Sequence, residues 1–176
     1  MNLSVSNWLY IVSMIVSLVS IFVSNYLGQR VASKKFKREQ ELLRYNSLYV
    51  PLMNLLYDQD PDKYAFFNLL SLNRFEPFED LMLNNVQFMG KESAEKFYKV
   101  IHEGKNAVIK RKNRTIELLK NGKKPEPLDK ETSEAINLYK SLLIQLLSES
   151  EELAKELKLE PISKPLREAL QQVQNL

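Results

Sequence analysis

The first 29 residues of this 176-residue chain contain no Lys, Arg, Asp or Glu, so every formally charged side chain lies after them. Within this stretch, residues 8–27 hold eleven Leu, Ile, Val and Phe side chains. A helix of 20 residues is about 30 Å long, which is roughly the thickness of the hydrocarbon core of a bilayer. The apolar side chains contribute roughly −3 to −7 kcal/mol to insertion, which the serines and Asn25 do not reverse. The sequence therefore predicts a transmembrane signal-anchor over residues 1–28.

A cleaved signal peptide is the alternative interpretation of this stretch. Such a peptide carries Lys or Arg before a shorter apolar core and a small-residue cleavage site after it. Here the opening MNLSVSN is uncharged, and the later SNYLGQR contains no such site. Trp8, Tyr10 and Tyr26 lie near the two ends of the apolar segment, where amphipathic rings favour the headgroup level. We therefore expect the segment to be retained as an anchor.

Four serines interrupt the apolar segment. They are Ser13, Ser17, Ser20 and Ser24. At about 100° per residue they form one narrow stripe, opposite bulky residues such as Leu18 and Phe22. Small residues let two helices approach closely, and hydroxyls can hydrogen-bond across the contact. In the alternative interpretation, each hydroxyl only bonds to the carbonyl four residues earlier. The stripe predicts pairing with another transmembrane helix, and a second copy of this chain in a homo-oligomer is one such partner.

A basic segment follows the anchor. Residues 30–44 hold six basic and two acidic side chains, a net charge of +4. Because basic residues favour the cytoplasmic side, we expect an outside N-terminus and a cytoplasmic C-terminus in the cell (inner or cytoplasmic) membrane. Basic side chains near a membrane also attract anionic lipid headgroups, although these charges could serve topology alone. The residues expected to contact lipid headgroups are Arg30, Lys34, Lys35, Lys37 and Arg38.

Residues 29–57 are predicted to form a juxtamembrane basic helix, because apolar residues from Leu42 to Leu56 recur at spacings of three and four. Pro51 lacks an N–H donor and crowds the carbonyl four residues earlier. We therefore expect a kink or break around Val50.

Residues 58–176 predict an all-α cytoplasmic bundle. The segment NGKKPEPLD, residues 121–129, ends a helix that starts near Lys91, and Asp129 can cap the next one, so the two predict a long antiparallel hairpin. The second helix carries an apolar stripe at alternating spacings of three and four. The stripe is wider than a strict coiled-coil seam, which favours a bundle core. Its seam residues are Ile136, Tyr139, Leu143, Leu146, Leu153 and Leu157.

Charge separates two of the predicted helices. Residues 105–124 hold eight basic side chains and one acidic side chain, whereas residues 126–160 hold nine acidic and four basic ones. We expect these opposite charges to pair. No aromatic residue lies between Tyr98 and Tyr139 to stack on bases, so the basic segment is a poor candidate for a nucleic-acid surface.

The sequence predicts no enzyme. It has no cysteine, one histidine and no nucleophile-turn or phosphate-loop glycine pattern. His102 lacks a partner at di-iron spacing and is expected on a helix surface or partly buried. The alternating Asp58, Asp60 and Asp62 resemble a calcium loop, but its required Gly and Glu positions hold Lys63 and Leu69. We therefore expect no metal and no cofactor, and we assign Asp60 and the following Pro61 to a helix start. Paired glutamates such as Glu151 and Glu152 are expected to be solvated.

These observations predict a single-pass membrane protein that acts as a scaffold or regulatory interaction module for an unknown cytoplasmic protein. Two alternatives remain open. One is an exclusion or defence effector of the phage or mobile-element type that acts at the membrane. The other is a membrane tether for nucleic acid. The layout resembles small single-pass proteins of bacteria and their mobile elements in organisation only.

Overall fold

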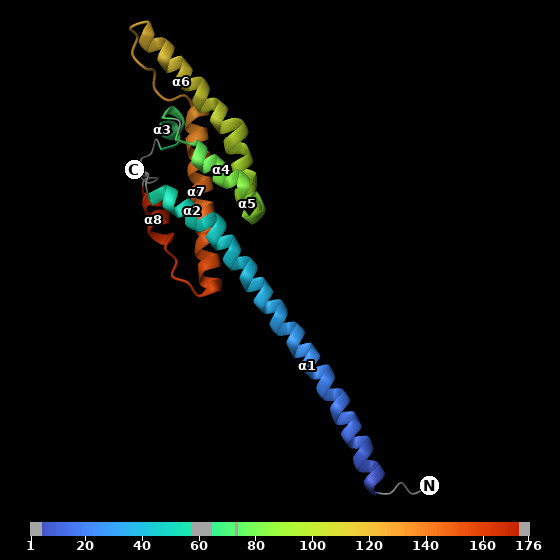
Figure 1. Ribbon diagram of the computed structural model, residues 1–176. Coiled ribbons are helices and arrows are strands. Elements are labelled where there is room, and N and C mark those ends of the chain that lie inside the picture. Colours follow the sequence, from blue (N-terminus) through green and yellow to red (C-terminus); the bar gives the residue numbers. More distant parts are fainter. Residues whose placement is uncertain (1–4, 58–64, 73, 173–176) are drawn as a thin grey trace. The chain divides into compact units, whose positions relative to one another are not determined.

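The computed structural model describes residues 5–57, 65–72 and 74–172 (Figure 1). All regular secondary structure in these ranges is helical, which confirms the predicted all-α class for the described part of the chain. The chain divides into two compact units, Met1–Glu41 and Leu42–Leu176. We call them the anchor unit and the helical unit.

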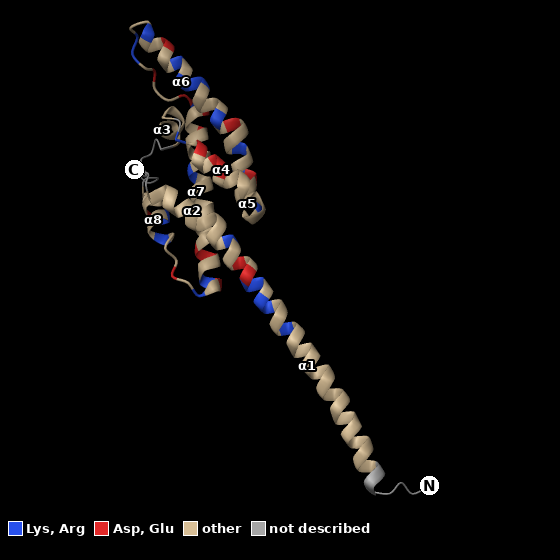
Figure 2. Ribbon diagram, in the orientation of Figure 1, with Lys and Arg blue, Asp and Glu red and all other residues tan. Residues whose placement is uncertain are grey.

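Helix α1 (Val5–Arg44) provides the whole described part of the anchor unit. Its apolar stretch contains no proline, so nothing interrupts the backbone hydrogen bonds. Figure 2 shows that charged side chains begin only after this stretch. There Lys35 lies 3.9 Å from Glu39, and Lys37 lies 3.2 Å from Glu41, both at the spacing of one helical turn. Such exposed pairs stabilise a helix by only a few tenths of a kcal/mol, about 0.3–0.5 each.

A π-helical segment, η1 (Tyr45–Tyr49), precedes helix α2 (Val50–Tyr57), which contains Pro51. The backbone N–H of Val50 donates to the carbonyl of Tyr45, five residues earlier instead of four. The disturbance expected around Val50 is therefore a widened turn just before the proline, and helical structure continues beyond it. A proline ring crowds the carbonyl of the preceding turn, and a wider turn relieves this crowding.

Five short segments follow. They are α3 (Ala65–Ser71), α4 (Glu76–Asn84), the 3-10 turn η2 (Val86–Phe88), α5 (Lys91–Lys99) and the π-helical η3 (Val100–Gly104). Helix α6 (Lys105–Lys120) continues from η3. It ends where Gly122 adopts a left-handed φ of 68° and Lys123 donates to the carbonyl of Leu118, a common glycine C-cap. The predicted helix start at Asp60 and Pro61, and Asp58 and Asp62 beside it, lie outside the described residues.

Helix α7 (Lys130–Leu157) is followed by α8 (Lys164–Gln172). The side chain of Asp129 accepts a hydrogen bond of 2.7 Å from the backbone N–H of Thr132, which confirms the predicted N-cap. At the other end Lys158 adopts a left-handed φ of 60°, and Leu159 donates to the carbonyl of Ala154. These contacts fix both ends of α7.

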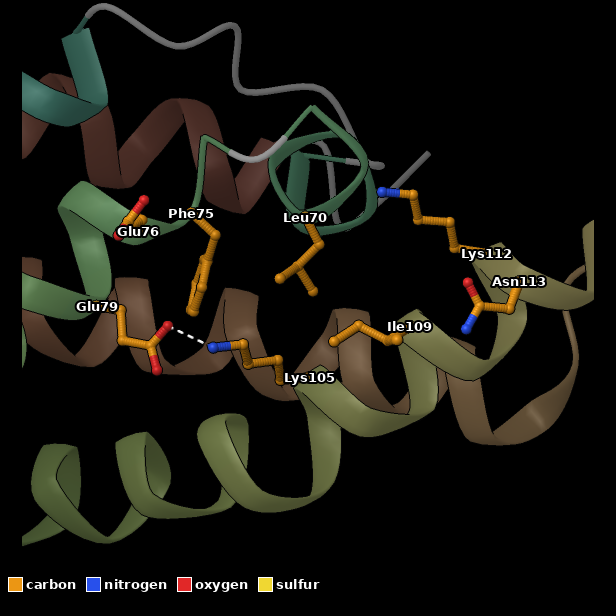
Figure 3. Close-up of a pocket in the computed structure, with 8 residues that line it drawn as sticks. All are labelled: Leu70, Phe75, Glu76, Glu79, Lys105, Ile109, Lys112 and Asn113. Atoms are coloured by element: carbon orange, nitrogen blue, oxygen red, sulfur yellow. Dashed lines mark hydrogen bonds and ion pairs between the residues drawn. The ribbon is translucent and has the colours of Figure 1, made fainter. Parts of the chain in front are cut away.

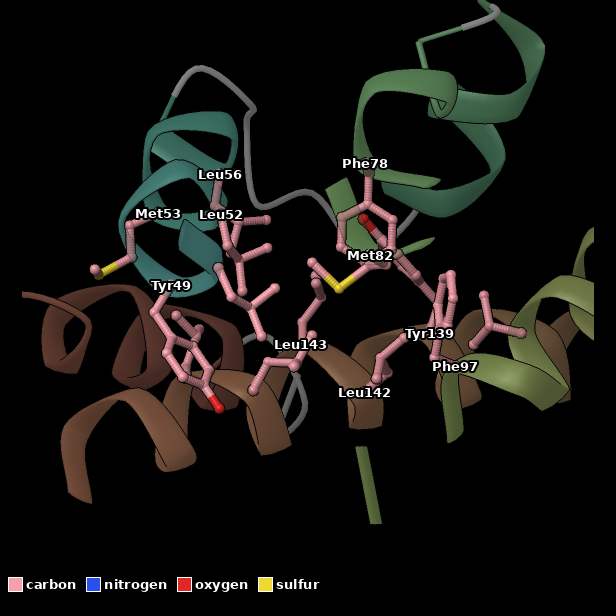
Figure 4. Close-up of a cluster of buried hydrophobic side chains, with 14 of the residues drawn as sticks. Tyr49, Leu52, Met53, Leu56, Phe78, Met82, Phe97, Tyr139, Leu142 and Leu143 are labelled. Carbon is pink, nitrogen blue, oxygen red and sulfur yellow. The ribbon is translucent and has the colours of Figure 1, made fainter. Parts of the chain in front are cut away.

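The core of the helical unit forms around α7, which contacts α3, α5, α6, α8 and both π-helical segments. Figure 4 shows residues of α2 and α4 packed with residues of α7 in this core. The ring of Tyr139 stacks on Phe66 at a centroid distance of 4.6 Å and meets Phe78 edge-on at 5.4 Å. Complete burial raises the pKa of Tyr139. This aromatic cluster joins α3, α4 and α7 in one core.

Candidate functional site

The apolar stretch of α1 is the first candidate functional feature. Every side chain from Trp8 to Gln40 is exposed within this chain. An 18-residue window of this helix has a mean hydropathy of 1.9, and none of it is buried. The helix is therefore long and apolar enough to cross a membrane. No other described segment covers this apolar surface. Burial in lipid would remove it from water.

The serine stripe lies on this helix. The hydroxyl of Ser17 donates to the carbonyl of Ser13 at 2.9 Å, and the hydroxyl of Ser20 donates to the carbonyl of Val16 at 2.8 Å. The alternative interpretation of the stripe predicts such bonds to the carbonyl four residues earlier. They satisfy the hydroxyl donors of both serines. Each hydroxyl oxygen keeps capacity to accept a further bond. Ser13 and Ser24 are exposed on the same face.

The five basic residues expected to contact lipid headgroups are all exposed, whereas Arg44 is partly buried. At about 100° per residue, Arg30, Lys34, Lys37 and Arg38 fall within an arc of roughly 100°, and Lys35 lies about 60° beyond it. Lys35 and Lys37 are also the partners of Glu39 and Glu41. The other three cations of this set extend from the same side of α1 as Lys37.

The predicted seam of α7 lies against the rest of the helical unit. Five of its residues are buried in the core, and Ile136 is partly buried. Leu142, Leu147 and Ala154 are buried as well, so the apolar stripe covers more of α7 than the predicted seam does. The five buried seam residues are Tyr139, Leu143, Leu146, Leu153 and Leu157.

A groove of about 490 Å³ opens between α3, α4 and α6 (Figure 3). Its apolar lining includes Leu70, Phe75 and Ile109, and its polar lining includes Glu76, Glu79, Lys105, Lys112 and Asn113. The ammonium group of Lys105 lies 2.6 Å from the carboxylate of Glu79 and 5.9 Å from the ring centre of Phe75. Lys112 donates to the backbone carbonyl of Ser71, at the end of α3, at 3.1 Å.

This groove combines an apolar floor with charged walls, a composition that suits an amphipathic ligand. Sequence reasoning assigned Lys105 and Lys112 only to a basic segment and did not single out Glu79. Glu79 and Lys105 are 26 positions apart, and no sequence pattern links them. Across the described residues, no group of three or more His, Cys, Asp and Glu side chains could hold a metal ion.

A second polar cluster surrounds Glu149 of α7. One carboxylate oxygen accepts hydrogen bonds from the hydroxyl of Tyr49 at 2.9 Å, the backbone N–H of Gly90 at 3.0 Å and the hydroxyl of Ser93 at 3.1 Å. Arg44 approaches the same oxygen at 3.4 Å and donates to Tyr49 at 2.7 Å. Burial and the nearby carboxylate of Glu149 raise the pKa of Tyr49. The cluster joins three segments and has a structural role.

The expectation of solvated glutamates is correct for Glu152 and wrong for Glu151. Glu152 is exposed, whereas Glu151 is buried beneath α8 and binds Arg167 through two hydrogen bonds of 2.6 and 3.2 Å. The bond to Glu151 raises the pKa of Arg167. Glu151 and Arg167 are 16 positions apart in consecutive helices, and the docking of α8 on α7 brings them together.

The opposite charges of α6 and the following segment meet at a few points. Arg114 lies 2.9 Å from Glu126, and Lys110 lies 3.7 Å from Glu131. Arg111 is buried and donates to the backbone carbonyl of Glu126. Lys105 instead pairs with Glu79 of α4. The basic segment is thus partly neutralised close to α7, and its far end remains basic. His102 is exposed on η3, as expected.

Comparison with known proteins adds no relative, since no family model, no curated protein and no solved structure matches this chain.

Proposed function

We propose that this chain is a non-enzymatic, single-pass membrane protein whose helical unit acts as a scaffold or regulatory interaction module on the cytoplasmic face. One observation carries the proposal, namely that the apolar stretch of α1 is exposed along its whole described length. An uncharged apolar helix in water exposes a surface that favours lipid by several kcal/mol, about 3–7 in this case.

The charge pattern supports the proposed orientation. The stretch before Arg30 is uncharged, and five exposed cations follow within nine residues, from Arg30 to Arg38. Basic residues close to one end of a span favour the cytoplasm, so the N-terminus is outside and the helical unit is cytoplasmic. The same cations are placed to contact anionic headgroups, each with about 1 kcal/mol of attraction.

The serine face supports pairing of the span with a second transmembrane helix. Its small side chains line one side of α1, and two of the hydroxyl donors are already satisfied within the helix. The desolvation cost of placing these two hydroxyls at a contact between helices is therefore small. Close packing of the two backbones provides the attraction. A second copy of the same span presents the same face and is the simplest partner.

The helical unit supports binding over catalysis. It has a buried core around α7 and a groove with an apolar floor. We propose that the unit is a bundle in which α6 and α7 form an antiparallel hairpin. The hydroxyl of Ser93 meets the carboxylate of Glu149, but Ser93 is fully buried and also bonds to the carbonyl of Gly90, which favours a structural role over a reactive one.

Membrane extraction and topology mapping test the proposal. The full chain should stay in the membrane pellet after washing with alkaline carbonate and should dissolve only in detergent. Because the chain has no cysteine, Ser4→Cys and Lys123→Cys can each be labelled with a membrane-impermeant maleimide. Intact cells should label the first and not the second. Release of the chain by carbonate would refute the anchor, and the reverse labelling would refute the orientation. Loss of membrane potential on expression would favour a membrane-acting effector.

A further inference from the structure

The face of α6 that lines the groove continues past it towards the end of the helix. Ile109 and Ile116 are seven residues apart, so they lie on one face, and both are exposed. Leu119 adds a third exposed apolar side chain beside them, at 56% exposure. From Lys105 to Lys120 this face is about 22 Å long.

Lysines border the apolar row along the same face. Lys105, Lys112 and Lys120 recur at spacings of seven and eight, which places them within an arc of about 80°. Glu79 neutralises Lys105, whereas Lys112 donates to the neutral backbone carbonyl of Ser71 and keeps its charge. Lys120 is exposed, as are Lys123 and Lys124 after it. Glu76 adds a further negative charge near α4, so the groove is slightly acidic near α4 and basic towards the end of α6.

We infer that this groove and the exposed face of α6, the α6 groove, bind an amphipathic helix of a cytoplasmic protein, with acidic side chains that lie over the distal half of α6. This inference rests on the proposed interaction function and names its partner class. A helix in a groove places side chains at positions i, i+3 or i+4 and i+7 into it, and Ile109, Ile116 and Leu119 provide the matching apolar contacts. The excess of lysine selects acidic partners over basic ones.

The shape of the site favours a protein helix over a lipid surface. The floor residues Leu70 and Phe75 are only 8% and 2% exposed, below walls formed by α4 and α6 (Figure 3). A side chain that projects from a helix can reach such a floor, and a flat bilayer surface cannot. The polar wall residues Glu76 and Asn113 can also bond to a partner helix at the rim.

Two labelled synthetic helices of about 16 residues, long enough to cover roughly 24 Å, test the inference. Both carry a leucine stripe, flanked by glutamates in the first and by lysines in the second. The full chain is held in nanodiscs of neutral lipid, and binding is followed by fluorescence anisotropy. The acidic helix should bind at least about tenfold more tightly than the basic one, with an affinity that falls as salt rises. Equal binding of both helices, or binding of neither, would overturn the inference.

Four variants locate the binding site. Ile116→Ser and Lys120→Glu change exposed residues of the α6 groove. Each should weaken binding of the acidic helix several-fold to about tenfold. Leu83→Ser on α4 and Lys110→Glu on another face of α6 are the matched controls, since both side chains are exposed outside the groove. They should leave affinity unchanged. If the controls weaken binding as much as the groove variants do, the assigned surface is wrong.

A lipid-binding role would give a different result. With Lys120→Cys carrying a polarity-sensitive dye, a partner site predicts a change of emission when the acidic helix is added. Emission that changes only when the nanodisc lipid is made anionic would assign this face to the membrane and overturn the inference. If the α6 groove does not bind the acidic helix, the chain should still resist extraction by carbonate. The failure of this inference can therefore be distinguished from the failure of the proposed function.

Discussion

The carboxylate of Glu149 lies 3.0 Å from the backbone nitrogen of Gly90, in the space that a side chain at residue 90 would need. Gly90 precedes α5 with an extended backbone, φ −67° and ψ 160°, which any residue can adopt. The requirement for glycine is therefore one of space. A Cβ atom at this position would overlap all three terminal atoms of Glu149.

Gly90→Ala should lower the free energy of unfolding by about 1–3 kcal/mol, because the carboxylate must move and its hydrogen bonds must lengthen. Chemical unfolding of the detergent-solubilised chain, followed by circular dichroism, measures the change. Gly104→Ala is the matched control, since a Cβ atom there meets Phe66 and Ala135 at ordinary contact distances of 3.5 and 3.6 Å. It should be neutral or stabilising by up to about 1 kcal/mol. Equal destabilisation by both substitutions would contradict this explanation.

Glu149→Gln should lower the free energy of unfolding by about 1–3 kcal/mol. The amide oxygen can still accept from Tyr49, Gly90 and Ser93, but the negative charge that strengthens these bonds and pairs with Arg44 is lost. The same unfolding measurement applies. Glu152→Gln removes a charge from an exposed position of the same helix and should change stability by less than about 0.5 kcal/mol. An equally small effect at residue 149 would show that the cluster contributes little.

Asp129→Ala should destabilise the helical unit by about 0.5–2 kcal/mol, and Asp129→Asn should restore most of the loss. The hydrogen bond from Thr132 lowers the pKa of Asp129 below its ordinary value of 3.8. Because the folded pKa is the lower one, the charged cap stabilises the fold fully above 3.8 and loses this contribution as pH falls through the lowered pKa. The difference in unfolding free energy between the original chain and Asp129→Ala should therefore narrow in strong acid. A difference that persists unchanged there would count against the charged cap.

Arg167→Met should destabilise the chain by about 2–3 kcal/mol, because it leaves the buried carboxylate of Glu151 without its bidentate partner. Adding Glu151→Leu should recover much of that loss, and a double-mutant cycle measures the coupling. Lys164→Met breaks the exposed pair with Glu168, 3.9 Å apart on the same helix, and should cost less than about 0.5 kcal/mol. A coupling near zero would mean that apolar contacts alone dock α8.

Single cysteines at Ser13, Ser17, Ser20 or Ser24 should form disulfide-linked dimers when membranes are oxidised, because the small face of α1 allows two helices to approach. Leu18→Cys and Phe22→Cys, on the bulky side, are the controls and should cross-link far less. Non-reducing gel electrophoresis reads the result without background, since the chain has no native cysteine. Equal cross-linking at all six positions would exclude a specific face, and none at any position would exclude a homotypic pair.

Features that depend on neighbouring residues were predictable from the sequence. The apolar length of residues 8–27, the cap at Asp129 and the glycine stop at Gly122 each rest on contacts within a few positions, and the structure has helices that begin, continue and end accordingly. The change of helical pitch beside Pro51 is also local, although its π-helical form was not foreseen, since a proline alone is equally compatible with a break.

Contacts between distant residues were decided only by the tertiary structure. Tyr49 meets Glu149 across 100 positions, and Gly90 meets it across 59, so no local pattern marks that glutamate as partly buried and hydrogen-bonded. The α6 groove likewise needs Glu79 and Lys105 to come together from two helices. Helical periodicity determines which face of a helix is apolar, because it follows from backbone geometry. Which charged side chain loses its water depends on how helices pack, and that is a property of the whole core.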